Sequence, residues 1–378
     1  MSNTLTNLIP DAYIALDVVS RELSGFIQSV ARDPAADRVA VGQTVRSHST
    51  PANAAGGDVT PAMALPSAAD QTIANKSFTI SKSRYFPFSW SGEEQLGMNA
   101  GPGFLNVKQD QIAQAIRAAL NEMESDLALA AKNGGSRAYG TPGTTPFAST
   151  LADPAQVRKI LDDNGAPSSD RHLCINTTAG AALRTLAQLT KANEAGSVDP
   201  MRRGTLLDLH GFEIRESAQV KNHTKGTGTG YVFNGSHAVG ATTIAADTGS
   251  GTILAGDVVA FEDDTNKYVV TTALAAGSFT IAAPGLLQAQ TDAKTITIGN
   301  NYAGNVAHTR NSVLLGTRLP ALPAEGDLAI DRETITDPVT GISLELAVYP
   351  GYRMLVYQVL VAWGVTVLKP EHIALLLG

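Results

Sequence analysis

The side chains that could do chemistry are scattered along this chain instead of being gathered into motifs. Its seven histidines form no His-x-x-x-His or His-x-His pair, so their spacing indicates no metal site. They are His48, His172, His210, His223, His237, His308 and His372. No Gly-x-Ser-x-Gly motif occurs, and no serine stands in another nucleophile signature. The sequence therefore predicts no catalytic residues, no cofactor-binding residues and no metal ligands.

Two segments look superficially like ligand-binding loops. The glycine run at residues 226–230 lacks the Gly-Lys-Ser/Thr ending of a phosphate loop, and no helical pattern follows it, so we expect a hinge there. The acidic run at residues 262–266 carries oxygen ligands that suit a hard cation, but the glycine and the distal glutamate of a calcium loop are missing. We interpret this second segment as a hairpin turn.

The composition is that of a globular protein with few charges. Of 378 residues, 43% are hydrophobic and only 17% are charged. Either surface buried against other subunits or a simple wealth of alanine and glycine explains this shortage of charge. The net charge of −7 argues against a dedicated nucleic-acid binder, which needs a basic face. The single cysteine, Cys174, lies in an apolar run, which excludes a disulfide framework and predicts a small buried side chain.

Neither a membrane segment nor an export signal is present in the pattern of apolar residues. The longest apolar run, residues 354–368, is shorter than a spanning helix requires and reads as a buried strand. The N-terminus lacks the basic, apolar and small-residue order of a signal peptide. We therefore expect a cytoplasmic protein without membrane contact.

One long amphipathic helix is the clearest element in the sequence. Apolar residues recur with helical spacing over residues 106–135, Asn106 and Gln109 resemble a capping box, and Gly134 and Gly135 supply the stop. About 26 helical residues give a rod of about 40 Å, long enough to cross a domain. On its own this pattern does not distinguish the helix from an ordinary core helix.

A long hairpin is expected before this helix. The elements that precede it are a helical pattern at residues 1–33, a strand at 38–46 and a strand at 72–90. At the end of the second strand Phe86, Phe88 and Trp90 alternate onto one face. The loop between the strands is longer than compact monomers usually contain, so we expect it to lie on a neighbouring subunit.

After the helix, strands and helices alternate, and then the chain becomes rich in β-structure. The first group comprises a helix at 153–164, a strand at 171–176, a helix at 178–190 and strand-like runs at 206–220. The second group comprises strands at 242–246, 257–262, 267–272, 278–282 and 295–298. Short, evenly spaced strands without a helix predict a small β-barrel or sandwich inserted into an α+β domain, which resumes near Tyr302.

In this order of parts the chain resembles the major capsid (coat) proteins of tailed bacteriophages. A helical arm, a long two-stranded loop, a spine helix, an α+β domain, an inserted β-domain and a return strand follow one another as they do in that family. The insertion is similar to the one in coat proteins of short-tailed phages. Local patterns that look like the family occur at residues 161–176, 204–217, 255–261, 279–284 and 363–371.

The resemblance implies the α+β tailed-phage capsid fold, with a long spine helix, an extended β-hairpin loop, an α+β axial domain and an inserted small β-barrel. The implied parts are an N-terminal helical arm at 1–36, an extended loop at 37–92, a peripheral domain with the spine helix at 93–150, a first axial part at 151–224, the inserted β-barrel domain at 225–300, and axial and peripheral return strands at 301–378.

The resemblance further implies a structural subunit, not an enzyme. Such subunits form hexamers and pentamers of an icosahedral head that encloses double-stranded DNA and matures from a procapsid assembled in the host cytoplasm. The implied partners are other copies of the chain, a portal protein and decoration proteins, and contact with DNA is expected to be weak. A separate scaffolding protein is also implied, because the arm begins almost at Met1. Candidate contacts between subunits, each of which also fits packing within its own subunit, are Phe26, Ile27, Phe86, Phe88 and Trp90.

Two other functions remain as alternatives. An oligomeric phage tail or adhesin component would use the β-rich insertion to bind a surface, although a long spine helix is less expected in it. A cytoplasmic α+β enzyme would need convergent polar residues in one pocket, and the sequence identifies none.

Overall fold

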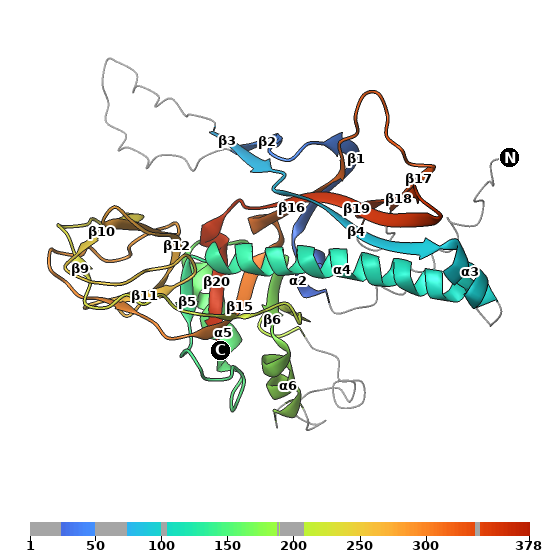
Figure 1. Ribbon diagram of the computed structural model, residues 1–378. Helices are drawn as coiled ribbons and strands as arrows, with labels where there is room; N and C mark the ends of the chain where they lie inside the picture. Colours follow the sequence, from blue (N-terminus) through green and yellow to red (C-terminus); the bar gives the residue numbers. More distant parts are fainter. Residues whose placement is uncertain (1–23, 50–73, 100–103, 187–188, 190–207, 337–340) are drawn as a thin grey trace, which may run out of the picture.

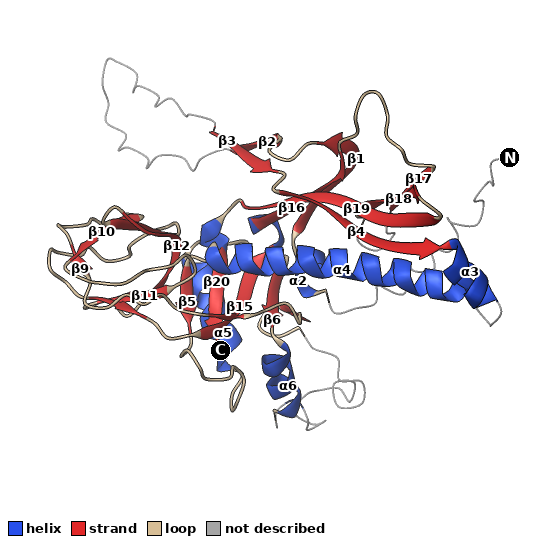
Figure 2. Cartoon of the chain, viewed as in Figure 1, coloured by secondary structure: helices blue, strands red, loops and turns tan. Residues whose placement is uncertain are grey.

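Two large sheets connected by one long helix form the frame of the molecule. The computed structural model describes residues 24–49, 74–99, 104–186, 189, 208–336 and 341–378. Helix α4 (Phe104–Asn133) runs beneath the first sheet and reaches the second, as Figure 1 shows. Figure 2 shows that the remaining regular structure consists mainly of strands, with a few shorter helices. This mixed α+β architecture agrees with the fold class expected from the sequence.

The first sheet, here called the peripheral sheet, lies along the outer half of α4. Its strand order is β1-β16-β19-β18-β17, and β4 pairs with β19. The strands are β1 (Ala31–Val39), β4 (Lys82–Ser91), β16 (Val313–Pro320), β17 (Asp331–Thr336), β18 (Ser343–Gly351) and β19 (Met354–Val367). The apolar run at residues 354–368 is therefore a long strand, as its composition indicated.

The second sheet, here called the axial sheet, carries helices α5 (Ala152–Asp163) and α6 (Thr177–Thr185). The strands in its first half are β7 (Glu213–Glu216), β6 (Arg171–Ile175), β15 (Tyr302–Thr309), β20 (Ile373–Leu377) and β5 (Arg137–Tyr139), in that order, with β8 (Asn222–His223) pairing with β15. Val157 and Leu161 of α5 pack into one apolar cluster with Leu173 and Leu376 of the sheet. The predicted strand at 171–176 is β6, whereas the helix predicted at 178–190 begins at Thr177 and ends already at Thr185.

The β-rich segment continues this sheet. Its strands are β9 (Val232–Phe233), β10 (Thr243–Asp247), β11 (Val258–Phe261), β12 (Lys267–Ala275), β13 (Ser278–Ile281) and β14 (Ile296–Ile298), close to the five predicted ranges. Phe233, Phe261 and Tyr268 belong to a separate apolar cluster inside it. Strand β12 pairs with β5, where Tyr268 lies opposite Arg137. The segment is thus hydrogen-bonded to the axial sheet through its longest strand.

Helix α4 forms because one face carries apolar side chains along its whole length. The fully buried positions follow the helical repeat and include Ile112, Ile116, Ala119, Met123, Leu127 and Ala131. The helix begins at Phe104, so Asn106 lies inside the first turn and is not the cap that the sequence suggested. It ends before Gly134, where an added Cβ would lie 2.6 Å from Cγ2 of Val367. The glycine is needed there for close packing on β19.

The segment before β4 differs most from its prediction. A helix ending at Asp33-Pro34 was expected, but the helix in the described part is the short α2 (Gly25–Ser29), and both residues belong to β1. The helical pattern before residue 24 lies outside the described residues. An antiparallel hairpin is present, but its strands are β2 (Thr44–Ser49) and β3 (Ala74–Thr79) instead of the predicted 38–46 and 72–90. The predicted second strand is split, and its second half, β4, pairs with β19. Strand β1 forms instead of helix because its backbone pairs in parallel with β16.

Two short 3₁₀ helices, η1 (Arg310–Ser312) and η2 (Pro370–His372), connect the two sheets. The second one contains the predicted turn after the long strand. Among the described residues no helix combines the length and the apolar character needed to cross a membrane.

Candidate functional site: the spine helix and its attachments

The aromatic face of β4 packs within its own chain. Trp90 is buried, and Phe86 and Phe88 are half-buried against the same apolar cluster. Phe88 stacks on Tyr357 of β19 with ring centroids 5.1 Å apart. The indole Nε1 of Trp90 donates a hydrogen bond of 2.6 Å to Oε1 of Gln111 on α4. The strand is thus attached to both the sheet and the helix, and contacts of these residues with another subunit stay a prediction.

Charged groups hold the start of β4 against α4. The ammonium of Lys82 donates to Glu122 at 3.0 Å and to Asp126 at 2.9 Å, and Nε1 of Trp363 donates to Asp126 at 2.9 Å. Desolvation lowers the pKa of Lys82, but the hydrogen bonds and charges of Asp126 and Glu122 outweigh it, so the pKa lies above its ordinary value. The acidic side chains of α4 and the basic side chains of β4 therefore fix the position of the strand along the helix.

The two predicted contact residues of the arm lie in the core. Phe26 and Ile27 are fully buried, so in this structure their side chains have no exposed area to offer a neighbour. Their backbone N–H groups donate to the carboxylate of Glu124 on α4 at 2.7 and 2.9 Å. These N–H groups start helix α2 and would otherwise lack partners. Glu124, which is 2% exposed, thereby anchors the described part of the arm to the middle of the spine helix.

A buried cluster near the arm has the residue types of a catalytic site. Nε2 of His308 lies 3.2 Å from Oγ of Ser29 and 3.9 Å from Sγ of Cys174. Burial raises the pKa of Cys174 to about 12 and lowers that of His308 to about 4. The thiol and the imidazole are thus both neutral near pH 7, and both side chains are fully buried. Because a nucleophilic cysteine must be an accessible thiolate, this cluster is suited to packing and not to catalysis.

A second buried network joins the end of α4 to the β-rich segment. Nζ of Lys132 lies 2.9 Å from Nδ1 of His223, whose Nε2 lies 2.8 Å from Oδ1 of Asp257. The Asp257 carboxylate is fully buried and also accepts the N–H groups of Gly226 and Leu254. Desolvation lowers the pKa of Lys132, and the charge of Asp257 opposes this shift. The network binds the helix, the first glycine of the glycine run and the β-rich segment together.

The glycine run is a packed segment. A Cβ added at Gly226 would collide with the carbonyl oxygen of Thr252, and the N–H of Gly228 donates to that same oxygen at 2.8 Å. Glycine is required here because two backbone segments approach closely. The expected hinge is thus held in place, because the N–H groups of residues 226–229 all donate to protein acceptors.

The acidic run is a hairpin turn between β11 and β12, as predicted. Asp264 accepts the N–H of Asn266 at 2.9 Å and the hydroxyl of Tyr268 at 2.6 Å, and Lys294 pairs with Asp263. Across the described ranges, no three His, Cys, Asp or Glu side chains come together as a metal site would require.

Sequence reasoning missed Glu124, Lys132 and Asp257, which hold the attachments of the spine helix. Glu124 and its partner Phe26 are 98 residues apart, so no local motif contains both. A usable signal exists for Glu124, because it lies three and four residues from Leu127 and Leu120 on the apolar face. A charged residue on an apolar face needs a buried partner.

Comparison with known proteins supports the fold. No family model matches this chain, and no curated protein sequence matches it. A capsid structure of the cyanophage P-SCSP1u has 12% sequence identity and a TM-score of 0.51, covering 93% of this chain and 87% of the other. The mature capsid of bacteriophage PhiM1 has 12% identity and a TM-score of 0.48, covering 93% of this chain and 86% of the other. A Mycobacterium phage Che8 structure has 13% identity and a TM-score of 0.47, covering 89% of this chain and 84% of the other.

The cyanophage comparison covers nearly the whole of both chains. At this low identity the likeness shows a common fold, and the two weaker likenesses are not used in the argument. The cyanophage structure is described as a capsid structure, and not as a tail protein or an adhesin. The chain therefore has the α+β phage capsid fold, while a separate inserted β-barrel stays a prediction.

Proposed function

We propose that this chain is the major capsid protein of a tailed bacteriophage. It is a structural subunit that assembles with copies of itself into hexamers and pentamers of an icosahedral head around double-stranded DNA. The observation that carries the proposal is the full-length likeness to the cyanophage capsid structure. In this role the chain makes and breaks no covalent bond, and its partners are a scaffolding protein, a portal protein and decoration proteins.

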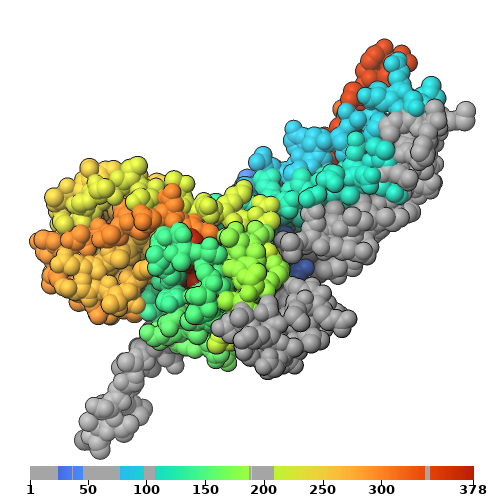
Figure 3. All heavy atoms as spheres, turned by 90° about the horizontal axis from the view of Figure 1, so that it is seen from below, coloured from blue at the N-terminus to red at the C-terminus, as the bar shows by residue number. Residues whose placement is uncertain are grey.

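The far end of the peripheral sheet offers a surface for self-association. Leu96 of helix α3 (Gly92–Asn99) is 75% exposed and Tyr352 is 92% exposed. Their segments meet there, since the N–H of Gly92 donates to the carbonyl of Arg353 at 3.1 Å. Figure 3 shows this end as a narrow tip on which the two segments lie together. Exposed apolar side chains that gather at one tip favour contact with another protein surface.

The β2–β3 hairpin supports the same role. Each of its strands pairs only with the other among the described strands, and Figure 1 shows it projecting from the peripheral sheet. Phe78 of β3 packs on Ala362 of the peripheral sheet, but a two-stranded hairpin is marginal in stability on its own. Lying on a neighbouring subunit would cover it, and Phe86 and Phe88 are the predicted contact residues that retain some exposed area.

We also propose the domain division that the resemblance implied, with an inserted β-barrel at residues 225–300. Its strands pair in the order β14-β11-β12-β13-β10-β9, and a bridge between Val232 and Thr295 joins the two ends of this path. Deleting residues 226–299 should leave a folded α+β remainder of lower stability, because the deletion removes Asp257 from the Lys132 network. Complete loss of secondary structure would contradict these boundaries.

Assembly can be tested directly. The chain is expressed with and without a scaffolding protein and studied by sedimentation and negative-stain microscopy, and closed particles are expected. A Tyr352→Ser variant should assemble less well while its free energy of unfolding as a monomer stays within about 0.5 kcal/mol of wild type, because its side chain is exposed. Only monomers and small soluble oligomers under every condition would refute the proposed function.

A further inference from the structure

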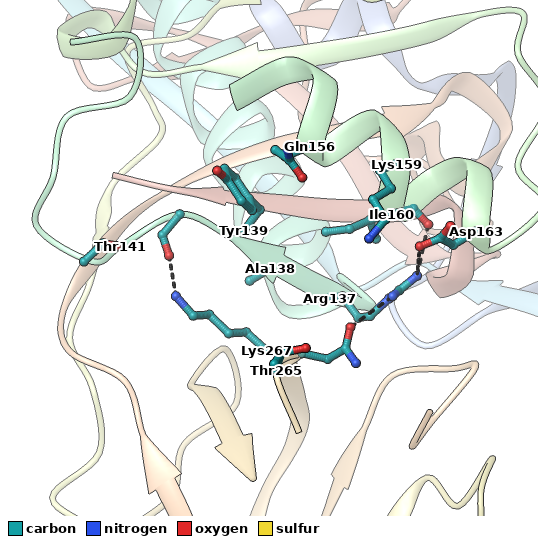
Figure 4. Close-up of a pocket in the computed structure, with 12 residues that line it drawn as sticks. Arg137, Ala138, Tyr139, Thr141, Gln156, Lys159, Ile160, Asp163, Thr265 and Lys267 are labelled. Carbon is teal, nitrogen blue, oxygen red and sulfur yellow. Dashed lines mark hydrogen bonds and ion pairs between the residues drawn. The ribbon is translucent and has the colours of Figure 1, made fainter. Parts of the chain in front are cut away.

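A polar cavity lies where the axial sheet meets the β-rich segment. It has a volume of about 370 Å³, within the usual range for small-ligand sites. Helix α5 forms one wall, β5 another, and the turn before β12 a third. Its charged lining consists of Arg137, Lys159, Asp163 and Lys267. Figure 4 shows Lys159 extending from α5 toward Arg137, whereas the ammonium of Lys267 points away from Arg137, to the carbonyl of Gly140.

Arg137 brings a buried positive charge to this cavity. Its side chain is 5% exposed, and the guanidinium donates to three neutral acceptors, which are Oδ1 of Asn164 at 2.9 Å, the carbonyl of Ile160 at 3.3 Å and Oδ1 of Asn266 at 3.3 Å. In the described part of the chain, the one carboxylate within ion-pair distance is that of Asp163, 3.7 Å away and 45% exposed. A buried charge that is paired so loosely is costly, and an anion beside it would reduce the cost.

The two lysines add charge that the protein does not neutralise. Nζ of Lys267 donates to the carbonyl of Gly140 at 2.5 Å, which is again a neutral acceptor. Lys159 is exposed, and no ion pair joins it to another described residue. Three positive side chains against one carboxylate give the lining a net charge of +2.

We propose that this cavity binds a phosphate group. A net charge of +2 matches a phosphate that carries up to two negative charges, whereas a single carboxylate would leave part of it uncompensated. Tyr139 and Gln156 line the same cavity and supply neutral donors. The bound group lies between α5, β5 and the turn before β12, so it strengthens the junction between the axial sheet and the β-rich segment.

The test uses the full-length, unassembled chain purified without phosphate. Titration calorimetry and thermal unfolding are carried out with inorganic phosphate, and sodium chloride at the same ionic strength serves as the salt control. Wild type should bind phosphate and unfold at a higher temperature in its presence, because a ligand of the folded state stabilises it. Because no particle is needed, failure of assembly and failure of binding are separate results.

Three variants make the test specific. Lys159→Gln should lower the affinity about tenfold, the value expected for one charge-assisted hydrogen bond. Asp163→Asn should raise the affinity, because it removes the one negative charge of the lining. Lys369→Gln changes an exposed lysine outside the cavity and should bind like wild type. All three positions are exposed, so the variants are expected to fold.

A second arm identifies the source of the phosphate. A ten-nucleotide single strand replaces inorganic phosphate in the same titrations. The site is supported if a probe binds and if its binding is weakened by Lys159→Gln but not by Lys369→Gln. The probe that meets this condition shows whether the site takes free phosphate or a nucleic-acid phosphate. No binding of either probe, or equal binding by all variants, would overturn the proposal.

Discussion

Replacing Glu124 by alanine should release the arm from the spine helix. The Glu124 carboxylate holds the N–H groups of Phe26 and Ile27, and both residues are fully buried beside it. Alanine offers no acceptor for these donors at a position that is only 2% exposed. The expected result is local detachment of α2, with exposure of the two apolar side chains that it now buries.

The size of the effect follows from the two unpaired donors. A buried N–H group that loses its partner costs about 1–3 kcal/mol, so two of them cost about 2–6 kcal/mol. Part of this is offset, because burial raises the pKa of Glu124 and charging it in the folded protein is therefore costly. The cost of charging Glu124 is absent below the ordinary pKa of a glutamate, where the side chain is protonated in both the unfolded and the folded chain. It grows as the pH rises from that ordinary pKa to the raised pKa of the folded chain. Near pH 7 we expect a net loss of about 2 kcal/mol.

Hydrogen exchange of the amides of residues 25–29 measures the release locally, and denaturant unfolding measures it globally. Glu122→Gln is the matched control, because it lies on the same helix and forms partly exposed ion pairs worth at most about 1 kcal/mol. Faster exchange of residues 25–29 is expected in Glu124→Ala alone. Unchanged protection there, together with unchanged stability, would refute the assigned role of the carboxylate.

Three further changes test the packing around the helix. Leu127→Ala should cost about 2–5 kcal/mol in denaturant unfolding because the side chain is fully buried, while Leu129→Ala, at a position 53% exposed, should cost less than about 0.5 kcal/mol. Asp257→Asn should cost about 1–3 kcal/mol and speed amide exchange in the glycine run, because the amide accepts fewer of the surrounding N–H groups. Acid should destabilise the chain through His308, because burial lowers the pKa of this imidazole from 6.5 to about 4. The stabilisation that comes from burying the neutral imidazole is complete above pH 6.5. About 3 kcal/mol of the free energy of unfolding is lost as the pH falls toward 4. His308→Gln should flatten that part of the stability profile, and an unchanged slope would count against the assignment.

Elements with a regular local pattern could be predicted from the sequence. The repeat of apolar residues identified α4, and the Asp153-Pro154 signal identified α5 to within one residue of its ends. Strands β10 to β14 followed from alternation and turn residues. The prediction failed where pairing between distant segments decides the structure. Asp33-Pro34 usually ends a helix, but here both residues pair with β16, some 280 residues later in the chain, and form a strand.

The candidate site was less predictable than the fold for the same reason. The aromatic face of β4 is visible in the sequence, but whether it meets the same subunit or another one depends on β19, which pairs with it across the sheet. Likewise, Lys132 reads as an ordinary basic residue in the last turn of a helix. Only the folded chain brings it to His223, 91 residues further on.

The three attachments give the polar side chains on the packed side of one helix a common role. Acidic and basic side chains of α4 hold strand β4 at Glu122 and Asp126, the arm at Glu124, and the β-rich segment at Lys132. Hydrophobic packing alone does not fix the register of a strand on a helix, whereas paired charges do, because a shift leaves them unpaired. A subunit whose arm, strand β4 and β-rich segment are positioned by one rigid helix presents these parts in a fixed relation to its neighbours, as the proposed assembly into a closed shell requires.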